Sequence, residues 1–246
     1  MSPMDAPRPI FLFTDFGWAG PYVGQMAAAI LAIEPRCAVI NLMHDAPAMR
    51  PDLAAYLLPA CCRSLPSGAI VVAVVDPGVG GERVALLVEA GGQTFLGPDN
   101  GLLSRLSGIE RVERIDWRPA VMSSSFHGRD LFAPLAARLA RGAAVAMTRL
   151  PYEAMAGADW PDQAAQVVYI DGYGNLMTGL RAEGLSKDRR IRVAARTIAY
   201  AETFCRVAAG ELFWYANSQG LVEIAANGAS AAKILSLALG GKILVD

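Results

Sequence analysis

The sequence is short of the residues that several common chemistries need. Among 246 residues there are only two histidines, His44 and His127, so a histidine-rich metal site is not expected. The four cysteines show no paired metal-ligand spacing, and we expect them to be buried free thiols. No cysteine lies beside a histidine and no Gly-x-Ser-x-Gly elbow is present, so covalent acyl transfer lacks its nucleophile signature.

Net charge and long apolar runs are scarce as well. The formal net charge is -1, and no basic run is present that could neutralise a row of phosphates, so nucleic acid is not expected as a partner. The most apolar run, residues 69–75, is far shorter than the roughly 18 to 20 residues that a membrane helix needs. The start of the sequence lacks a basic region followed by an apolar one. We therefore expect a cytoplasmic protein without membrane partners.

The first part of the sequence alternates short apolar runs with amphipathic segments, which is typical of layered α/β domains. We expect residues 1–150 to form an α/β domain around a central, largely parallel sheet. Ala38–Met43 and Ile70–Val75 are expected as central strands, the second because it is too continuously apolar to have one solvated face. The other expected elements are a strand over residues 10–14, helices over residues 21–35, 51–62 and 130–141, and a hairpin over residues 84–96 that turns at Gly91 and Gly92.

Residues 151–163 interrupt this pattern with polar and proline-containing sequence and are expected to form a linker. Beyond them, residues 164–246 contain short β-like segments, at 165–170, 212–215 and 221–225. We expect a smaller, mostly β domain there.

Polar and glycine-rich clusters directly follow the predicted strands, where an open α/β sheet forms its ligand crevice. Taken singly, such clusters are often only turns. Together they bring Asp76, Arg83 and His127 onto loops near one crevice. An aspartate held by an arginine stays ionised and can orient a histidine or a water molecule.

Six ordered motifs then make the chain recognisable. They are T-D-F-G at 14–17, V-V-D-P-G-V-G-x-x-R at 74–83, G-P-D-N-G-L at 97–102, F-H-G-R-D-x-F-A-P at 126–134, D-G-Y-G-N-L-x-T at 171–178 and N-S-x-G-L-V-E-I-A at 217–225. With them the chain resembles, nearly end to end, the S-adenosyl-L-methionine hydroxide adenosyltransferase family, relatives of the fluorinating and chlorinating enzymes. The resemblance implies hydrolysis of S-adenosyl-L-methionine to adenosine and L-methionine by water at C5′, without a cofactor or a metal.

The resemblance also implies roles for particular residues. In the family an Asp, an Arg and a His fix the attacking water, and these match Asp76, Arg83 and His127 in the first domain, which would be the catalytic one. The substrate-binding residues implied are Asp15 for the ribose, Asp171 and Ser218 for the methionine amino and carboxylate groups, Asn175 for the adenine edge and Phe213 for packing on the purine.

The halogenating relatives carry an aromatic residue where this chain has Asp76, a serine near the position of His127 and a hydroxyl residue at the position of Val79, so use of halide is not expected. The chain departs from the family pattern at Met49 and Arg50, where an aromatic residue and an Asp are usual; this departure bears on substrate affinity. Relatives form trimers with sites shared between subunits, which implies a homotrimer here.

Two other classes of function remain open from the sequence. A non-catalytic sensor of adenosine or S-adenosylmethionine would keep Asp15, Asn175 and Ser218 but would not need the Asp-Arg-His set. A metal-dependent hydrolase could instead use Asp15, Asp76, Asp99 and His127 as ligands.

Overall fold

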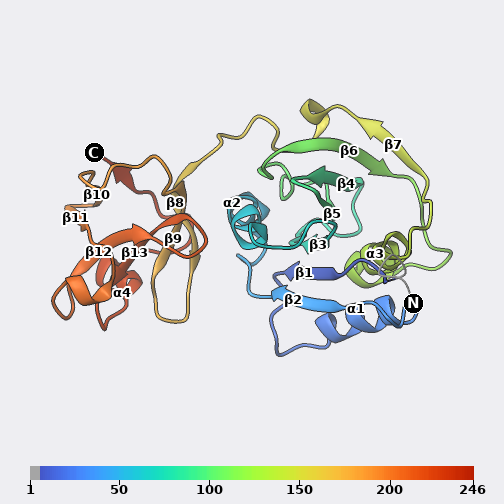
Figure 1. Ribbon diagram of the computed structural model, residues 1–246, viewed down its shortest axis with the longest axis horizontal. Helices are drawn as coiled ribbons and strands as arrows, with labels where there is room; N and C mark the ends of the chain where they lie inside the picture. Colours follow the sequence, from blue (N-terminus) through green and yellow to red (C-terminus); the bar gives the residue numbers. More distant parts are fainter. Residues whose placement is uncertain (1–5) are drawn as a thin grey trace. The chain divides into compact units, whose positions relative to one another are not determined.

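The computed structural model describes residues 6–246, which divide into two compact units, one ending at Trp160 and the other beginning at Pro161 (Figure 1). Each unit is built around its own mixed β-sheet. No helix within residues 6–246 is long and apolar enough to cross a lipid bilayer.

The sheet of the first unit has seven strands among the described residues, in the order β2-β1-β3-β5-β4-β6-β7. The described part of this unit also contains three α-helices, a π-helical turn and a 3-10 turn. The bounds are β1 Ile10–Thr14, α1 Tyr22–Leu31, β2 Val39–Met43, α2 Pro51–Cys62, β3 Ile70–Val74, β4 Ala85–Ala90, β5 Gln93–Pro98, β6 Ile109–Ile115, η2 Gly128–Phe132, α3 Ala133–Ala140, β7 Met147–Leu150 and the short 3-10 turn η3 Tyr152–Ala154.

The prediction of a largely parallel sheet is confirmed only for one half of the sheet and is wrong for the other. The neighbours β2, β1, β3 and β5 are parallel, but β5, β4, β6 and β7 pair antiparallel. Helices α1 and α2 supply the long crossovers that parallel strands need, whereas β4 and β5 are joined directly through Gly91 and Gly92, both with positive φ. Strands β6 and β7, which were not predicted from the sequence, extend the antiparallel half.

One strand expected at the centre of the sheet lies at its edge. The β3 strand is buried throughout and has a neighbour on each side, as predicted. The β2 strand is one of the two edge strands, and its residues are half-buried or exposed. Its polar Asn41 and exposed Ile40 fit an edge better than a centre.

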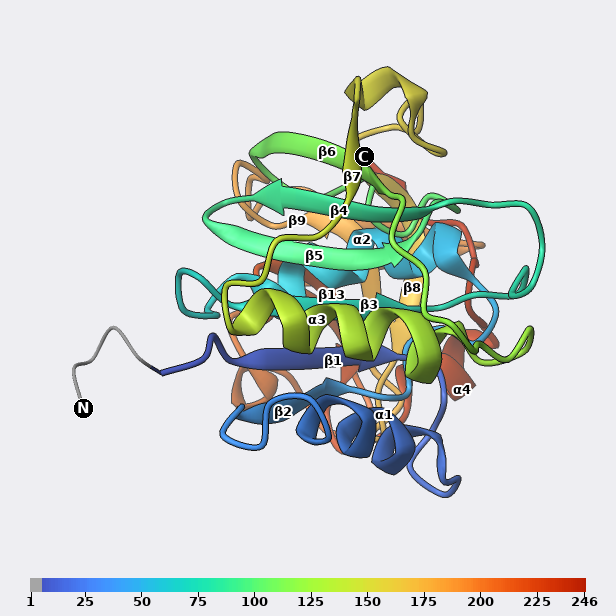
Figure 2. The same cartoon turned by 90° about the vertical axis from the view of Figure 1, so that its right-hand side faces the viewer.

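Helices cover both faces of the first sheet (Figures 1 and 2). Helices α1 and α3 pack on one face, and α2 lies on the other. The alternation of side chains along β1 divides the core, because Ile10 and Leu12 pack with Met26 and Ile30 of α1, while Phe11 and Phe13 point to the opposite face. The carboxyl ends of the four parallel strands therefore lie at the same end of the sheet.

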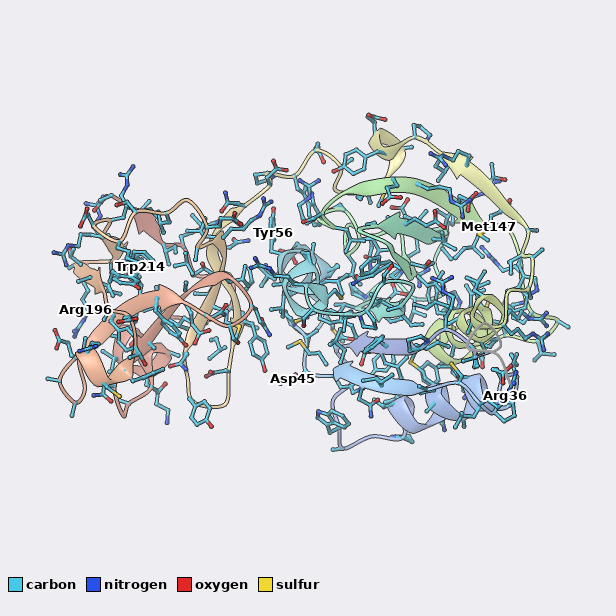
Figure 3. The ribbon with its side chains drawn as sticks, viewed as in Figure 1. Arg36, Asp45, Tyr56, Met147, Arg196 and Trp214 are labelled. Carbon is cyan, nitrogen blue, oxygen red and sulfur yellow. The ribbon has the colours of Figure 1, made fainter. Side chains whose placement is uncertain are left out.

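The second unit is mostly β, as predicted. Its sheet has the order β14-β10-β11-β12-β13-β9-β8, and only β11 and β12 pair in parallel. Trp214 of β12 is fully buried with Val222 and Ile224 at the centre of this unit (Figure 3). The bounds are β8 Ala164–Ile170, β9 Leu176–Arg181, β10 Ile191–Val193, β11 Arg196–Tyr200, η4 Phe204–Arg206, β12 Leu212–Ala216, β13 Leu221–Ala226, α4 Ala231–Leu235 and β14 Leu244–Val245.

Candidate active site

The polar loops of the first unit start at the same edge of the sheet. Thr14 and Val74 are register partners at the ends of β1 and β3, so the loops that begin with Asp15 and Asp76 leave the sheet side by side. His44 follows β2 and Asp99 follows β5 at the same edge, because both strands run parallel to these two. The loops expected to line a ligand crevice therefore begin at the same end of the sheet.

Asp76 and Arg83 form the central ion pair of this edge. Arg83 Nε donates to Asp76 Oδ1 at 2.6 Å, and Arg83 Nη2 pairs with the second carboxylate oxygen. Only 4% of the Asp76 side chain and 12% of the Arg83 side chain are exposed. The intervening glycine-rich turns fold the chain back on itself, since Val79 N–H donates to Asp76 O and Gly81 N–H to Gly78 O. The two charges are thus held in a bidentate, poorly hydrated pair.

His127 reaches the same pair from a different loop. Arg83 Nη2 lies 3.4 Å from His127 Nδ1, which brings the three residues predicted as catalytic into one cluster. Gly80 has φ of +83°, and a Cβ there would lie 2.5 Å from the carbonyl oxygen of Ser124. Only glycine therefore permits this close approach of the two loops.

The surroundings of His127 favour its neutral form. Burial lowers the pKa of His127 below its ordinary value of 6.5, the positive charges of Arg83 and Arg118 lower it further, and Asp130 opposes them. Only 7% of the residue is exposed, and among the described residues its Nε2 atom has no hydrogen-bond partner. A buried ring nitrogen without a partner costs free energy, which is often found where a ligand completes the site.

Asp15 lies at the end of β1 and is held by the loop after β2. Its Oδ2 accepts from the backbone N–H of Met49 at 2.9 Å, and burial raises the pKa of Asp15. Met49 has a left-handed φ of 56° and a side chain that is largely exposed, at 72% for the residue. The contact with Asp15 uses only the backbone, so the departure from the family pattern at Met49 preserves it. Arg50 pairs with Asp52 at the start of α2.

His44 is part of the scaffold beneath this edge. It is fully buried, with Nδ1 2.8 Å from Thr14 Oγ1 and Nε2 3.0 Å from Asn41 Oδ1. Burial lowers the pKa of His44, so the ring is held neutral. Its two partners lie on the neighbouring strands β1 and β2. His44 therefore holds the end of β1 in place, directly before Asp15.

In the second unit, Asp171 and Asn175 form one turn. Asp171 Oδ1 accepts from the backbone N–H groups of Tyr173 and Asn175, both at 2.9 Å, and Oδ2 accepts from Asn175 Nδ2 at 2.9 Å. Because the Asn175 amide nitrogen is held by Asp171, Oδ1 is the acceptor that the buried Asn175 offers to a ligand.

The other two predicted residues of this unit differ in exposure. Ser218 is exposed on the turn between β12 and β13. Phe213 is 1% exposed and belongs to a small core cluster with Ala201 and Ala225, and the rings of Phe204 and Tyr215 pack against it. In this arrangement Phe213 serves the core of the unit, and no face of its ring is open to a purine.

The predicted metal-site alternative is not supported by the arrangement of the acidic residues. Within residues 6–246, no group of three or more His, Cys, Asp or Glu side chains is placed to hold a metal ion. Asp99, one of the four residues considered, instead accepts a hydrogen bond from the backbone N–H of Ala156 at 2.8 Å.

Both units match models of known protein domains. Residues 10–149 match the family model of the SAM hydroxide adenosyltransferase N-terminal domain, and residues 165–244 match that of the C-terminal domain. The chain belongs to the SAM hydroxide adenosyltransferase family. The resemblance deduced from the six motifs is thereby confirmed.

Relatives in this family match over nearly the full chain. The (R)-S-adenosyl-L-methionine hydrolase of Salinispora arenicola is 36% identical over 94% of this chain and 95% of its own, and that of Thermus thermophilus is 33% identical over 95% and 97%. Two solved structures share the fold. An uncharacterized conserved protein of Thermotoga maritima matches with a TM-score of 0.87 and 29% identity, over 96% of this chain and 100% of its own. A conserved hypothetical protein of Thermus thermophilus matches with a TM-score of 0.79 and 34% identity, over 97% of this chain and 100% of its own.

Two polar residues of the family motifs have roles that the sequence analysis missed. Asn100 Nδ2 donates to the carbonyl oxygen of Val75 at 2.9 Å and so fixes the backbone directly before Asp76. Glu223 is buried in the middle of β13, where it accepts hydrogen bonds from Tyr215 and Asn217. The signal for Glu223 was in the sequence, since a carboxylate inside a continuously apolar strand needs polar partners.

Proposed function

We propose that this protein hydrolyses S-adenosyl-L-methionine to adenosine and L-methionine by attack of water on C5′, with Asp76, Arg83 and His127 holding the water. The observation that carries the proposal is the buried cluster of these three residues with an unpartnered His127 Nε2, in a chain whose two halves both match the family.

The demands of the reaction match what the cluster offers. The O–C5′ bond forms while the C5′–S bond breaks, and the sulfur keeps the electron pair, so the sulfonium leaves as a neutral thioether. No general acid is needed on the leaving side. The enzyme has to hold one water in line with the breaking bond and accept its proton, for which positioning and general-base help are the established means.

The hydrogen bond to Arg83 defines what His127 does. A guanidinium only donates, so His127 Nδ1 accepts from Arg83, and the neutral ring carries its hydrogen on Nε2. His127 then donates from Nε2 to the oxygen of the water rather than taking its proton. This hydrogen bond fixes the position of the water, so that a lone pair of its oxygen can face C5′.

Asp76 is the remaining group that accepts the proton. Its pairing with Arg83 makes it a weak base, but a weak base suffices because the oxygen becomes strongly acidic as its bond to C5′ forms. A carboxylate close to the sulfonium would stabilise the ground state, whose charge disappears in the transition state. Pairing with Arg83 reduces this cost.

Substrate binding falls to the other predicted residues. We propose that Asp15 binds the ribose hydroxyls, that Asn175 Oδ1 accepts from the adenine amino group, and that Asp171 and Ser218 bind the amino and carboxylate groups of methionine. Phe213 acts beneath this surface as a packing residue.

No cofactor or metal takes part in the proposed reaction, since the three residues account for the positioning of the water. Activity is expected to be unchanged after treatment with an excess of chelator. Loss of activity on chelation, with recovery on added divalent metal, would point to a metal-dependent hydrolase.

Incubation of the purified protein with S-adenosyl-L-methionine tests the proposal directly. Adenosine and L-methionine are expected in equal amounts by chromatography. The relatives are named (R)-S-adenosyl-L-methionine hydrolases. The descriptor L already gives the configuration of the amino-acid α-carbon, so R describes the configuration at the sulfonium sulfur. The two sulfonium epimers should therefore be assayed separately, with faster turnover expected for R. Binding without product formation would favour the sensor.

We also propose that the protein is a homotrimer in which the first domain of one subunit and the second domain of the next share each site. The proposal rests on the resemblance and on the division of labour between the two units. The test is to co-express subunits that carry Asp76→Ala with subunits that carry Asn175→Ala. The mixed trimers should regain activity at low substrate concentration, because some of their sites combine an intact first domain with an intact second domain. An active monomer in sedimentation, or no recovery in verified mixed trimers, would leave only a site within one chain.

A further inference from the structure

Glu223 is a buried carboxylate to which the proposed chemistry assigns no role. It lies in β13 and is 2% exposed. Tyr215 Oη donates to its Oε1 at 2.5 Å, and Asn217 Nδ2 donates to its Oε2 at 2.8 Å. Both oxygens thus accept hydrogen bonds, the pattern of an ionised carboxylate. Burying such a charge is costly, and a leucine would fill this position more simply.

Through Asn217, Glu223 fixes the turn that carries Ser218. Asn217 Oδ1 accepts from the backbone N–H groups of Gln219 at 3.0 Å and Leu221 at 2.9 Å. The backbone of the turn is closed by the N–H of Asn217 on Leu221 O and by the N–H of Gly220 on Asn217 O. Because Asn217 points its nitrogen at Glu223, its oxygen is oriented toward the turn.

The negative charges of Glu223 and Asp171 act on each other. Burial raises the pKa of Glu223, the hydrogen bonds from Tyr215 and Asn217 oppose this, and the negative charge of Asp171 raises the pKa further. The same two carboxylates raise the pKa of Tyr215, after burial as the main cause. The two acidic groups therefore share one electrostatic environment, and a positive group placed there relieves their repulsion.

We propose that Glu223 is a positioning residue for the amino-acid group of the substrate: it orients the Ser218 turn through Asn217, and together with Asp171 it supplies negative charge for an α-ammonium group. This inference rests on the proposed function, because it presupposes that Asp171 and Ser218 receive the methionine part. Glu223 is too deeply buried to touch the substrate itself.

The test compares two substrates in the full-length protein and the Glu223→Gln variant. The introduced amide can still accept from Asn217 with its oxygen, so this change removes mainly the charge. One substrate is S-adenosyl-L-methionine; the other is 5′-deoxy-5′-(dimethylsulfonio)adenosine, which keeps the nucleoside and sulfonium but has no amino-acid group. Affinity is measured as KM, or as Ki if the second compound is not turned over. Glu211→Gln, which changes an exposed carboxylate of the same unit, is the matched control.

The expected result is selective. Glu223→Gln should raise KM for S-adenosyl-L-methionine about tenfold with kcat nearly unchanged, and should leave the affinity for the second compound within about twofold. An equal loss for both compounds, or no loss for either, would overturn the assignment. If Glu223→Gln does not fold, Asn217→Ala gives the same comparison through the turn. A wild-type protein that releases no adenosine refutes the proposed function, and the assignment of Glu223 falls with it.

Discussion

The proposed site residues of the two units differ in whether their buried polar atoms have hydrogen-bond partners. In the second unit, the oxygens of Asp171 and Glu223 all accept hydrogen bonds from the unit itself. In the first unit, the buried Nε2 of His127 has no such partner among the described residues. An unpaired buried atom costs free energy that substrate or water can recover, whereas carboxylates whose oxygens already accept hydrogen bonds are held in place before a ligand binds. This difference supports our proposal that the first unit carries out the chemical step and the second provides affinity.

The largest effect on this difference between the units is expected from substitutions in the Asp76–Arg83–His127 cluster of the first unit. Asp76→Asn and His127→Ala are each expected to lower kcat by about 10²-fold or more, with KM changed less than about threefold, because they remove the positioning of the water but no binding contact. Steady-state kinetics with S-adenosyl-L-methionine measures both constants.

A third variant, His127→Gln, distinguishes whether His127 acts as a hydrogen-bond donor to the water or as a base. Its amide can still donate a hydrogen bond near the position of Nε2, so it should keep more activity than His127→Ala. Equal inactivity of the two variants, both folded by circular dichroism, would assign His127 the role of base instead. Near-wild-type turnover of His127→Ala would remove the residue from the mechanism.

The next largest effect is expected at the contact between the two catalytic loops. Gly80→Ala adds a Cβ 2.5 Å from Ser124 O at a positive φ, so the loops must move apart and kcat should fall more than tenfold. Gly24→Ala is the matched control, since Gly24 lies inside α1 with open space around it. That change should leave kcat unaltered and raise the free energy of unfolding by about 0.5 to 1 kcal/mol. Normal activity of Gly80→Ala would show that the contact is dispensable.

A change in the second unit should act on affinity instead. Asn175→Ala removes the amide that Asp171 orients and is expected to raise KM about tenfold, with kcat within about threefold of wild type. Competition by adenosine should weaken in parallel. A variant that lost kcat at unchanged KM would contradict the division between the units.

The smallest expected effect is the dependence on pH. Because burial and the positive charges of Arg83 and Arg118 lower the pKa of His127 below 6.5, the ring is neutral at pH 7, and kcat should be level from pH 7 to 8 and fall only in more acidic solution. The same shift makes the unfolded chain bind the proton more readily, so stability falls as the pH drops through 6.5. The loss in Tm between pH 7 and 5 should be smaller in His127→Gln. A kcat that already halves between pH 8 and 7 would contradict a lowered pKa.

The sequence allowed the strand ends to be predicted better than the sheet. Apolar runs located β1 and β3, and Asp15 and Asp76 follow them as predicted. The antiparallel half was missed because β6 mixes Glu and Arg with apolar residues along a half-buried strand, which no apolar run marks. Spacing along the chain also could not reveal that Asn100 binds the backbone before Asp76, since that contact depends on β5 lying beside β3.

The most direct test of the central claim uses S-adenosyl-L-methionine in ¹⁸O-labelled water. In the proposed mechanism water attacks C5′ itself and Asp76 forms no covalent ester with that carbon, so mass spectrometry should find one labelled oxygen, in the 5′-hydroxyl of adenosine, after a single turnover. Unlabelled adenosine, or methylthioadenosine as the main product, would contradict the account.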